Sequence, residues 1–150
     1  MVKFENVSMV YPGGEQRAID DMSFTINDGE FVFLVGPSGS GKTSVIKLVT
    51  GEVDACDGQL FVNGFDLRNM RRSRLPAMRR TIGVVFQDFR LIEDKTIYDN
   101  VAFAMHVVGA TNKDIRRRVP YVLELVGLEG REKRYPRELS GGEQQRVAIA

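Results

Sequence analysis

The stretch "GPSGSGKT", Gly36 to Thr43, decides the fold because it fits the pattern G-x-x-x-x-G-K-[S/T] of a phosphate-binding turn. It follows the apolar run "EFVFLV", residues 30–35, which is typical of a strand buried on both faces of a parallel sheet. It precedes "TSVIKLV", residues 43–49, whose apolar residues have helical spacing. The sequence therefore predicts a strand, a glycine-rich turn and a helix within an α/β fold.

The residue types in this turn indicate a site for a nucleoside triphosphate with Mg²⁺. Glycines allow positive φ and leave no Cβ in the way of a ligand, and successive N–H groups form an anion nest. The following helix adds the positive end of its dipole. Lys42 supplies a charge for the β- and γ-phosphates, and Thr43 offers a hydroxyl to Mg²⁺. The residues assigned to this site are Gly36, Pro37, Ser38, Gly39, Ser40, Gly41, Lys42, Thr43 and Ser44.

Strand patterns occur on both sides of the turn. Residues 2–11 alternate between apolar and polar side chains like a half-buried strand, and residues 18–26 read as a second strand. The pair Asn63-Gly64 predicts a hairpin within "GQLFVNGFDL". The run "TIGVVFQ", residues 81–87, is a further apolar strand.

The stretch from Asp94 to Leu128 is helical in pattern, and Gly109 and Gly127 punctuate it. Pro120 lies inside this stretch, where a proline removes an intrahelical hydrogen bond and costs about 3 kcal/mol if nothing compensates. We therefore predict a helix boundary near Val119.

Composition sets limits on the class of protein. The chain has 150 residues and a net charge of +1, which argues against a general nucleic-acid binder and allows one domain. Six arginines and no acid lie between Arg68 and Arg80, and this run indicates a solvated face, or a patch near anionic lipid headgroups, rather than a DNA site. The single cysteine, Cys56, fits a reducing compartment. No apolar run is long enough to span a membrane, so any membrane role goes through a partner.

The stretch "LSGGEQQ", Leu139 to Gln145, has two interpretations. Ser140 followed by Gly141 and Gly142 leaves N–H groups free at a helix start, which makes an anion site. Ser140 with Glu143 also fits a capping box, which would make the stretch an ordinary capped helix start. The presence of a phosphate-binding turn in the same chain favours the anion site.

The chain resembles the nucleotide-binding subunits of ABC ATPases over all 150 residues. The phosphate-binding turn, "VVFQD" and "LSGGEQQRVAIA" occur in the order found in that family. Within it, "FENVSMVYPGG", "KTIYDNVAFAM" and "RRRVPYVLELVGL" are most similar to the cell-division ATP-binding subunits. The resemblance implies an α/β P-loop NTPase core with an N-terminal antiparallel β-subdomain and an α-helical subdomain. It divides the chain at about residues 1–87 and 88–150.

The resemblance also implies roles for residues that the turn does not contain. Tyr11 matches the aromatic residue on which the family stacks adenine, and Gln87 matches a glutamine that reaches Mg²⁺ or the attacking water. Lys42 and Gln87 are thus expected to act in catalysis, and Thr43 and Gln87 to contact Mg²⁺. The residues Ser140, Gly141, Gly142 and Glu143 are expected to contact the ATP held by the other subunit of a homodimer.

The implied function is that of an ATP-binding subunit of a membrane complex in bacterial cell division. The partner would be an FtsX-like integral membrane protein that contacts Asp88 to Asp99, at the cytoplasmic face of the inner membrane, and no nucleic acid is expected. Two alternatives stay open: a subunit of a lipoprotein- or macrolide-type exporter, and a nucleotide-binding module without hydrolysis.

The family's Mg²⁺-holding aspartate, catalytic glutamate and switch histidine are expected after residue 150. We therefore expect the C-terminal part of the fold to be missing, as in a truncated or partial sequence, and this chain alone to be inactive in hydrolysis. The strands expected at residues 30–35 and 81–86 would then have no neighbours, which predicts an unstable or aggregation-prone protein.

Overall fold

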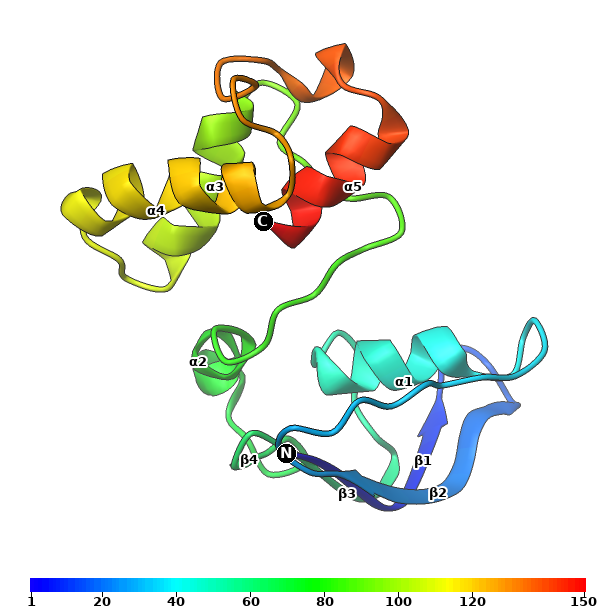
Figure 1. Ribbon diagram of the computed structural model, residues 1–150. Coiled ribbons are helices and arrows are strands. Elements are labelled where there is room, and N and C mark those ends of the chain that lie inside the picture. Colours follow the sequence, from blue (N-terminus) through cyan, green and yellow to red (C-terminus); the bar gives the residue numbers. More distant parts are fainter. The chain divides into compact units, whose positions relative to one another are not determined.

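The computed structural model describes residues 1–150 and divides into two compact units, residues 1–82 and 83–150 (Figure 1). The first unit contains an antiparallel sheet with helices, and the second is helical. Each unit has its own cluster of buried apolar side chains.

The first unit is built on a four-stranded antiparallel sheet in the order β2-β1-β3-β4. The predicted hairpin is confirmed, because the turn between β3 and β4 consists of Asn63 and Gly64, both with positive φ. The two predicted N-terminal strands are confirmed as well. The strands are β1 (Val2–Val10), β2 (Arg17–Ile26), β3 (Asp57–Val62) and β4 (Phe65–Asp66).

An irregularity in the central strand keeps its apolar side chains on one face. Asn6 has φ 51°, and the register of β1 against β2 shifts between Phe4 and Val7. Phe4 and Val7 are both buried although they are three residues apart, a spacing that regular alternation would place on opposite faces. The Asn6 side chain donates to Asp21 Oδ1 at 2.9 Å, which stabilises the bulge.

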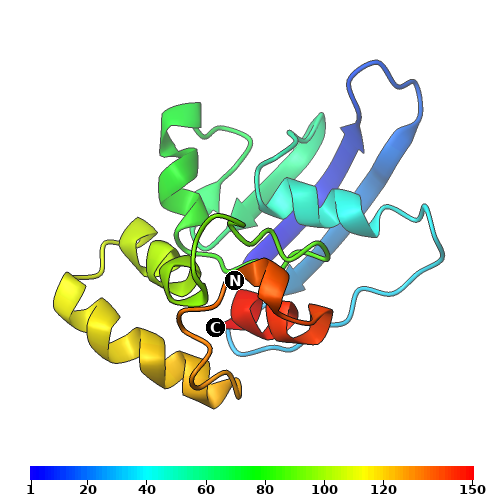
Figure 2. The same ribbon diagram turned by 90° about the horizontal axis from the view of Figure 1, so that it is seen from above.

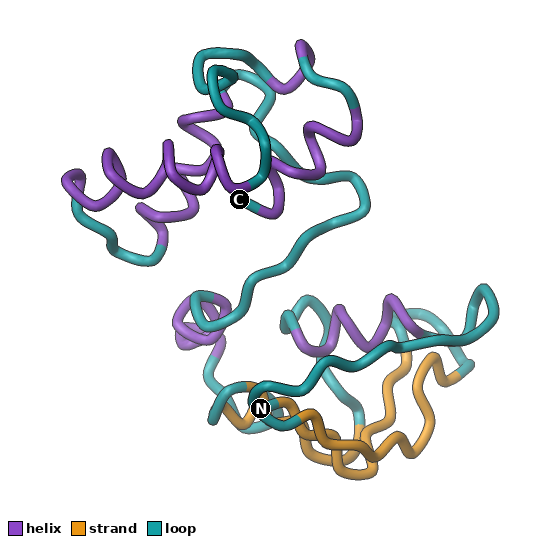
Figure 3. The backbone as a smooth tube through the Cα atoms, viewed as in Figure 1, coloured by secondary structure: helices purple, strands orange, loops and turns teal.

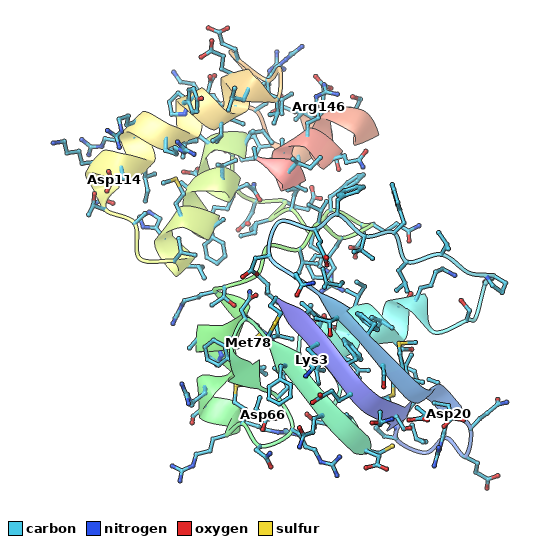
Figure 4. The ribbon with its side chains drawn as sticks, turned by 60° about the horizontal axis from the view of Figure 1, so that its bottom comes forward. Lys3, Asp20, Asp66, Met78, Asp114 and Arg146 are labelled. Carbon is cyan, nitrogen blue, oxygen red and sulfur yellow. The ribbon has the colours of Figure 1, made fainter.

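Helix α1 (Lys42–Val49) covers this sheet, as Figures 1 and 2 show from two directions. Its buried residues Val45 and Leu48 join Phe4, Val7 and Leu60 in one core. After β4 the chain forms the 3₁₀ turn η1 (Arg72–Arg74) and the short helix α2 (Leu75–Arg79), whose Met78 is fully buried (Figure 4).

The second unit packs its helices around a separate core. Thr96 and Thr111 cap α3 and α4 by accepting hydrogen bonds from the N–H groups of Asp99 and Asp114. The elements are α3 (Ile97–Val107), α4 (Asn112–Leu125), η2 (Pro136–Glu138) and α5 (Gly141–Ile149). Their shared core consists of Ile97, Val101, Ala102, Ile115, Val119, Leu123, Leu128, Leu139 and Val147.

Two predicted strands are wrong for this structure. Residues 30–35 and 81–86 form no strand and are drawn as loops in Figure 3. The side chains of Phe31, Phe33 and Val35 are 83%, 77% and 82% exposed instead of buried. An extended segment becomes a strand only when a neighbouring strand accepts its hydrogen bonds, and neither segment has such a neighbour among residues 1–150.

The predicted helix boundary near Val119 is also wrong. Helix α4 continues through Pro120 to Leu125. Pro120 lies on the exposed side of the helix, as does Arg116, whose carbonyl loses its helical donor at this point. Water can hydrogen-bond that carbonyl, while Val119 and Leu123 on the other side keep the helix packed against the core.

No helix of the structure is both long and apolar enough to cross a membrane.

Candidate functional site

The glycine-rich turn leads directly into α1, which begins at Lys42 as the motif predicts. Gly39 and Gly41 have φ of 81° and 86°, a conformation that favours glycine. A Cβ at Gly41 would lie 2.7 Å from the carbonyl oxygen of Ala18, and one at Gly36 would lie 2.6 Å from Ser40 Oγ. Gly41 therefore needs glycine for both conformation and space, Gly39 for conformation alone, and Gly36 for the space beside the Ser40 hydroxyl.

The Lys42 side chain folds back onto the turn and hydrogen-bonds to its backbone. Its Nζ donates to the carbonyl oxygens of Gly36 at 2.8 Å and Pro37 at 2.6 Å, and it lies 3.4 Å from Ser40 Oγ. The ammonium group is thus held at the centre of the turn by oxygen acceptors. Phosphate oxygens are acceptors of the same kind with more negative charge, so the turn fits a phosphate group.

Thr43 is exposed beside this lysine, and its hydroxyl makes no hydrogen bond within the protein. The hydroxyl is therefore available to a metal ion that bridges protein and phosphate. No group of three or more His, Cys, Asp or Glu side chains could hold a metal ion without such a ligand. The residues present fit Mg²⁺ bound together with phosphate, since Mg²⁺ keeps several ligands from substrate and water.

Tyr11 lies beside the start of α1, as a nucleotide-binding role would require. Its hydroxyl is 3.0 Å from Ser44 Oγ, and Lys47 Nζ lies 5.3 Å from the centre of its ring. Tyr11 is half-buried, and Ser44 is buried. The structure thus brings Tyr11, Lys42, Thr43 and Ser44 together in the first unit, and the stacking of adenine on Tyr11 stays a prediction.

Gln87 occupies an exposed turn in the second unit, whereas Lys42 belongs to the first. The turn is closed by a hydrogen bond from Phe89 N–H to the carbonyl of Phe86 at 3.0 Å. Arg90 adds a cation–π contact, with its guanidinium carbon 3.8 Å from the centre of the Phe86 ring. The structure describes Gln87 and the phosphate-binding turn separately, so the role of Gln87 stays a prediction.

The stretch after Leu139 forms a capped helix start with an open end. Ser140 Oγ accepts the N–H of Glu143, and both the N–H and the hydroxyl of Ser140 donate to Glu143 Oε2 at 2.8 and 2.7 Å. The capping box is therefore present. The N–H groups of Gly141 and Gly142 make no hydrogen bond within the protein, so the cap still leaves two donors for an anion.

The same cap changes the charge state of its carboxylate. Hydrogen bonds from the Ser140 hydroxyl and then from the Ser140 N–H stabilise the ionised form and lower the pKa of Glu143. Arg131 Nε, 3.9 Å from Glu143 Oε1, adds a weaker attraction in the same direction. Glu143 is thus an anion placed next to the two free N–H groups.

Two arginines of the run between Arg68 and Arg80 lie near acids, and a third bonds to backbone carbonyls. Arg68 lies 3.2 Å from Asp57, and Arg72 lies 3.5 Å from Asp54. Arg79 donates to the carbonyls of Thr50 and Gly51 at the end of α1. This arrangement favours a solvated face over a lipid or DNA site.

Sequence reasoning missed Asn100, whose side chain bonds to three residues of the segment predicted to contact a membrane partner. No motif in the sequence singles out this asparagine, because its partners are backbone groups.

Comparisons with known proteins agree with the turn and the fold. A family model described as "ABC transporter" matches residues 19–150. The "Cell division ATP-binding protein FtsE" of Mycobacterium tuberculosis is 49% identical over 100% of this chain and 65% of that protein. The proteins of the same name from Bacillus subtilis and Escherichia coli K12 are both 45% identical over the whole chain. The chain spans 65% of the Bacillus subtilis protein and 67% of the Escherichia coli protein.

Solved structures of ATP-binding cassettes have the same fold. The "Dimeric structure of a post-hydrolysis state of the ATP-binding cassette MJ0796 bound to ADP and Pi" has a TM-score of 0.88 and 33% identity. That comparison covers 99% of this chain and 67% of that one. A "Structure of ATP binding subunit of ABC transporter" has a TM-score of 0.87 and 27% identity, over 99% of this chain and 60% of the other. Together with the glycine-rich turn, these findings show that the chain belongs to the ABC transporter family.

Proposed function

We propose that this chain provides ATP-binding elements of an ABC-type ATPase that works with a membrane partner in bacterial cell division. The observation that carries the proposal is the glycine-rich turn closed around Lys42, in a chain whose full length matches cell-division ATP-binding proteins. The three curated relatives named above all carry the cell-division name, which favours that role over lipoprotein or macrolide export.

Nucleotide binding would replace internal contacts of the turn by contacts to phosphate. Lys42 would exchange the carbonyls of Gly36 and Pro37 for β- and γ-phosphate oxygens, which are stronger acceptors. Thr43 would hold Mg²⁺, which neutralises charge on the phosphates when bound. Tyr11 would contact the base, while the hydrogen bond of its hydroxyl to Ser44 Oγ fixes the ring.

The start of α5 would serve a second subunit. Gly141 and Gly142 present two free N–H groups beside a helix dipole, and the cap of Ser140 and Glu143 holds that end rigid. In the proposed homodimer these groups contact the γ-phosphate bound to the other chain. The dimeric cassette MJ0796, bound to ADP and Pi, is the relative that supports this arrangement.

Hydrolysis and membrane coupling complete the proposal. Phosphoryl transfer in this family depends on positioning and charge, to which Lys42 and Gln87 would contribute. An FtsX-like membrane protein would contact the segment from Asp88 to Asp99 at the cytoplasmic face of the membrane. Preferential copurification with an exporter-type permease instead would assign the chain to export.

Substitution of the turn lysine tests the nucleotide site. We expect Lys42→Ala to weaken binding of a fluorescent ATP analogue by about 100-fold, since a charge-assisted contact to phosphate contributes about 1.5–3 kcal/mol and the turn loses its central cation. The measurement is a fluorescence titration with Mg²⁺ present.

Lys47→Ala provides the control, because Lys47 lies in the same helix but contacts the Tyr11 ring and no atom of the turn. It should lower affinity by no more than about fivefold, the value of a single exposed cation–π contact. Equal losses in the two variants would contradict a phosphate site at Lys42.

A further inference from the structure

Asn100, the fourth residue of α3, bonds to the loop that precedes this helix through every polar atom of its side chain. Its Oδ1 accepts the N–H of Ile92 at 2.7 Å. Its Nδ2 lies within hydrogen-bond distance of three carbonyl oxygens, those of Ile92 at 3.1 Å, Lys95 at 3.2 Å and Thr96 at 2.9 Å. One half-buried amide group thus determines the path of residues 92–96.

Other contacts fix the base on which this loop rests. The N–H of Lys95 donates to Ile92 at 3.1 Å, which closes a turn inside the loop. The N–H groups of Ile97 and Tyr98 donate to the carbonyls of Arg134 and Glu132 at 2.8 and 2.9 Å. The start of α3 is therefore anchored to the segment before η2, and Asn100 links the loop to that anchored helix.

The side chains at the tip of the loop are not bonded to the rest of the protein. Glu93, Asp94 and Lys95 are exposed, and their side chains make no hydrogen bond or ion pair within the protein. The backbone of this loop is already fixed by its hydrogen bonds, and the exposed side chains at its tip are free to contact a partner. The loop therefore has little conformational entropy to lose when a partner binds.

We infer that Asn100 is a positioning residue, which fixes residues 92–96 in the shape that the membrane partner contacts. The inference rests on the proposed function, which assigns the segment from Asp88 to Asp99 to that partner. It adds the residue on which the shape of the segment depends. Loss of the amide leaves the loop to be ordered during binding, so the partner's affinity falls although Asn100 itself is not expected to touch the partner.

Asn100→Ala tests the inference with three measurements on the full chain. Amide hydrogen exchange at Ile92 should become at least about tenfold faster, because its N–H loses its acceptor. Affinity for the FtsX-like membrane protein of the same genome, held in detergent micelles, should fall by about tenfold. Affinity for the fluorescent ATP analogue should stay within about twofold of the wild type, since Asn100 lies outside the unit that holds the phosphate-binding turn.

Two further variants separate loop shape from general damage to the protein. Asn100→Asp has nearly the same size and keeps the acceptor for Ile92 N–H, but it loses the donors to the three carbonyls. It should retain protection at Ile92 and still bind the partner more weakly. Asn112→Ala removes an exposed asparagine from the first turn of α4 whose side chain makes no contact of this kind, and it should change none of the three measurements.

Two results would overturn the inference. The first is unchanged exchange at Ile92 in Asn100→Ala, which would show that the loop keeps its shape without the amide. The second is faster exchange with unchanged affinity for the membrane partner, which would make Asn100 purely structural. If the wild-type chain does not bind the membrane partner at all, the proposed function fails, and exchange still decides whether Asn100 holds the loop.

Discussion

Gly58 is the residue at which the sheet tolerates a side chain least. It has φ 79°, and a Cβ built on it would lie 2.2 Å from the carbonyl oxygen of Asn6 in the bulged part of β1. Neither the Asn6 carbonyl nor the Gly58 backbone can move without breaking the pairing of β1 with β3. The bulge at Asn6 and the glycine at position 58 therefore depend on each other.

We expect Gly58→Ala to lower the free energy of unfolding by roughly 3 kcal/mol or more, because it adds a backbone clash to an unfavourable φ. Urea unfolding monitored by circular dichroism measures the change. Gly64→Ala is the matched control, since Gly64 has φ 81° but no atom within 4 Å of the added Cβ. Its cost should be about 1–2 kcal/mol, the conformational part alone. Equal costs would show that the β3 backbone moves away freely.

At the scale of elements, the cap of α5 connects helix stability to pH. Hydrogen bonds from Ser140 lower the pKa of Glu143, so the cap stabilises the folded state above the ordinary glutamate pKa of about 4.3. That stabilisation is lost as the pH falls through the lowered pKa of the folded state. The first turn of α5 should consequently fray only in acid.

Replacement of the capping serine should reduce the shift in the pKa of Glu143. We expect Ser140→Ala to raise the pKa of Glu143 towards its ordinary value, because the hydroxyl donor is the largest cause of the shift. An NMR titration of the Glu143 carboxyl carbon measures the pKa directly. Ser73→Ala, in the 3₁₀ turn η1 of the other unit, should leave it unchanged. A Glu143 pKa that does not respond to Ser140→Ala would mean that the Ser140 N–H, which alanine keeps, and not the hydroxyl lowers the pKa.

Elements whose hydrogen bonds are local were predictable from the sequence. The start of α1 at Lys42 follows from the glycine turn, and the cap at Ser140 follows from Glu143 three residues later. Residues 30–35 have the composition of a buried strand, but a strand forms only when a neighbouring strand pairs with it. The local sequence does not show whether such a neighbour exists. Asn100 escaped prediction for a similar reason, since its acceptors and donors are backbone atoms without a sequence pattern.

At the scale of the whole molecule, the exposed run of residues 30–35 is the segment that most favours aggregation. Phe31 and Phe33 stack edge to face with ring centres 4.9 Å apart, and both are more than three quarters exposed. An apolar segment with unused backbone donors and acceptors pairs readily with other chains. The protein should therefore self-associate through this segment.

We expect the double substitution Phe31→Ser and Phe33→Ser to reduce self-association, because it removes exposed apolar area without opening a cavity. Sedimentation velocity over a range of protein concentrations measures the fraction of larger species. Phe4→Ser with Phe24→Ser is the contrasting pair, since those rings stack 4.5 Å apart on the sheet and Phe4 is buried. That pair should lower the melting temperature and increase aggregation. Unchanged association after loss of Phe31 and Phe33 would place the contact elsewhere.

The hydrogen bonds of Arg79 at the far end of α1 have an electrostatic consequence for the turn. A helix of eight residues is about 12 Å long, so its positive and negative poles nearly cancel for a distant charge. The Arg79 guanidinium bonds to the carbonyls of Thr50 and Gly51 and offsets the negative pole. An approaching polyphosphate then experiences the positive pole and Lys42 with less opposition, and the attraction extends farther into the solvent.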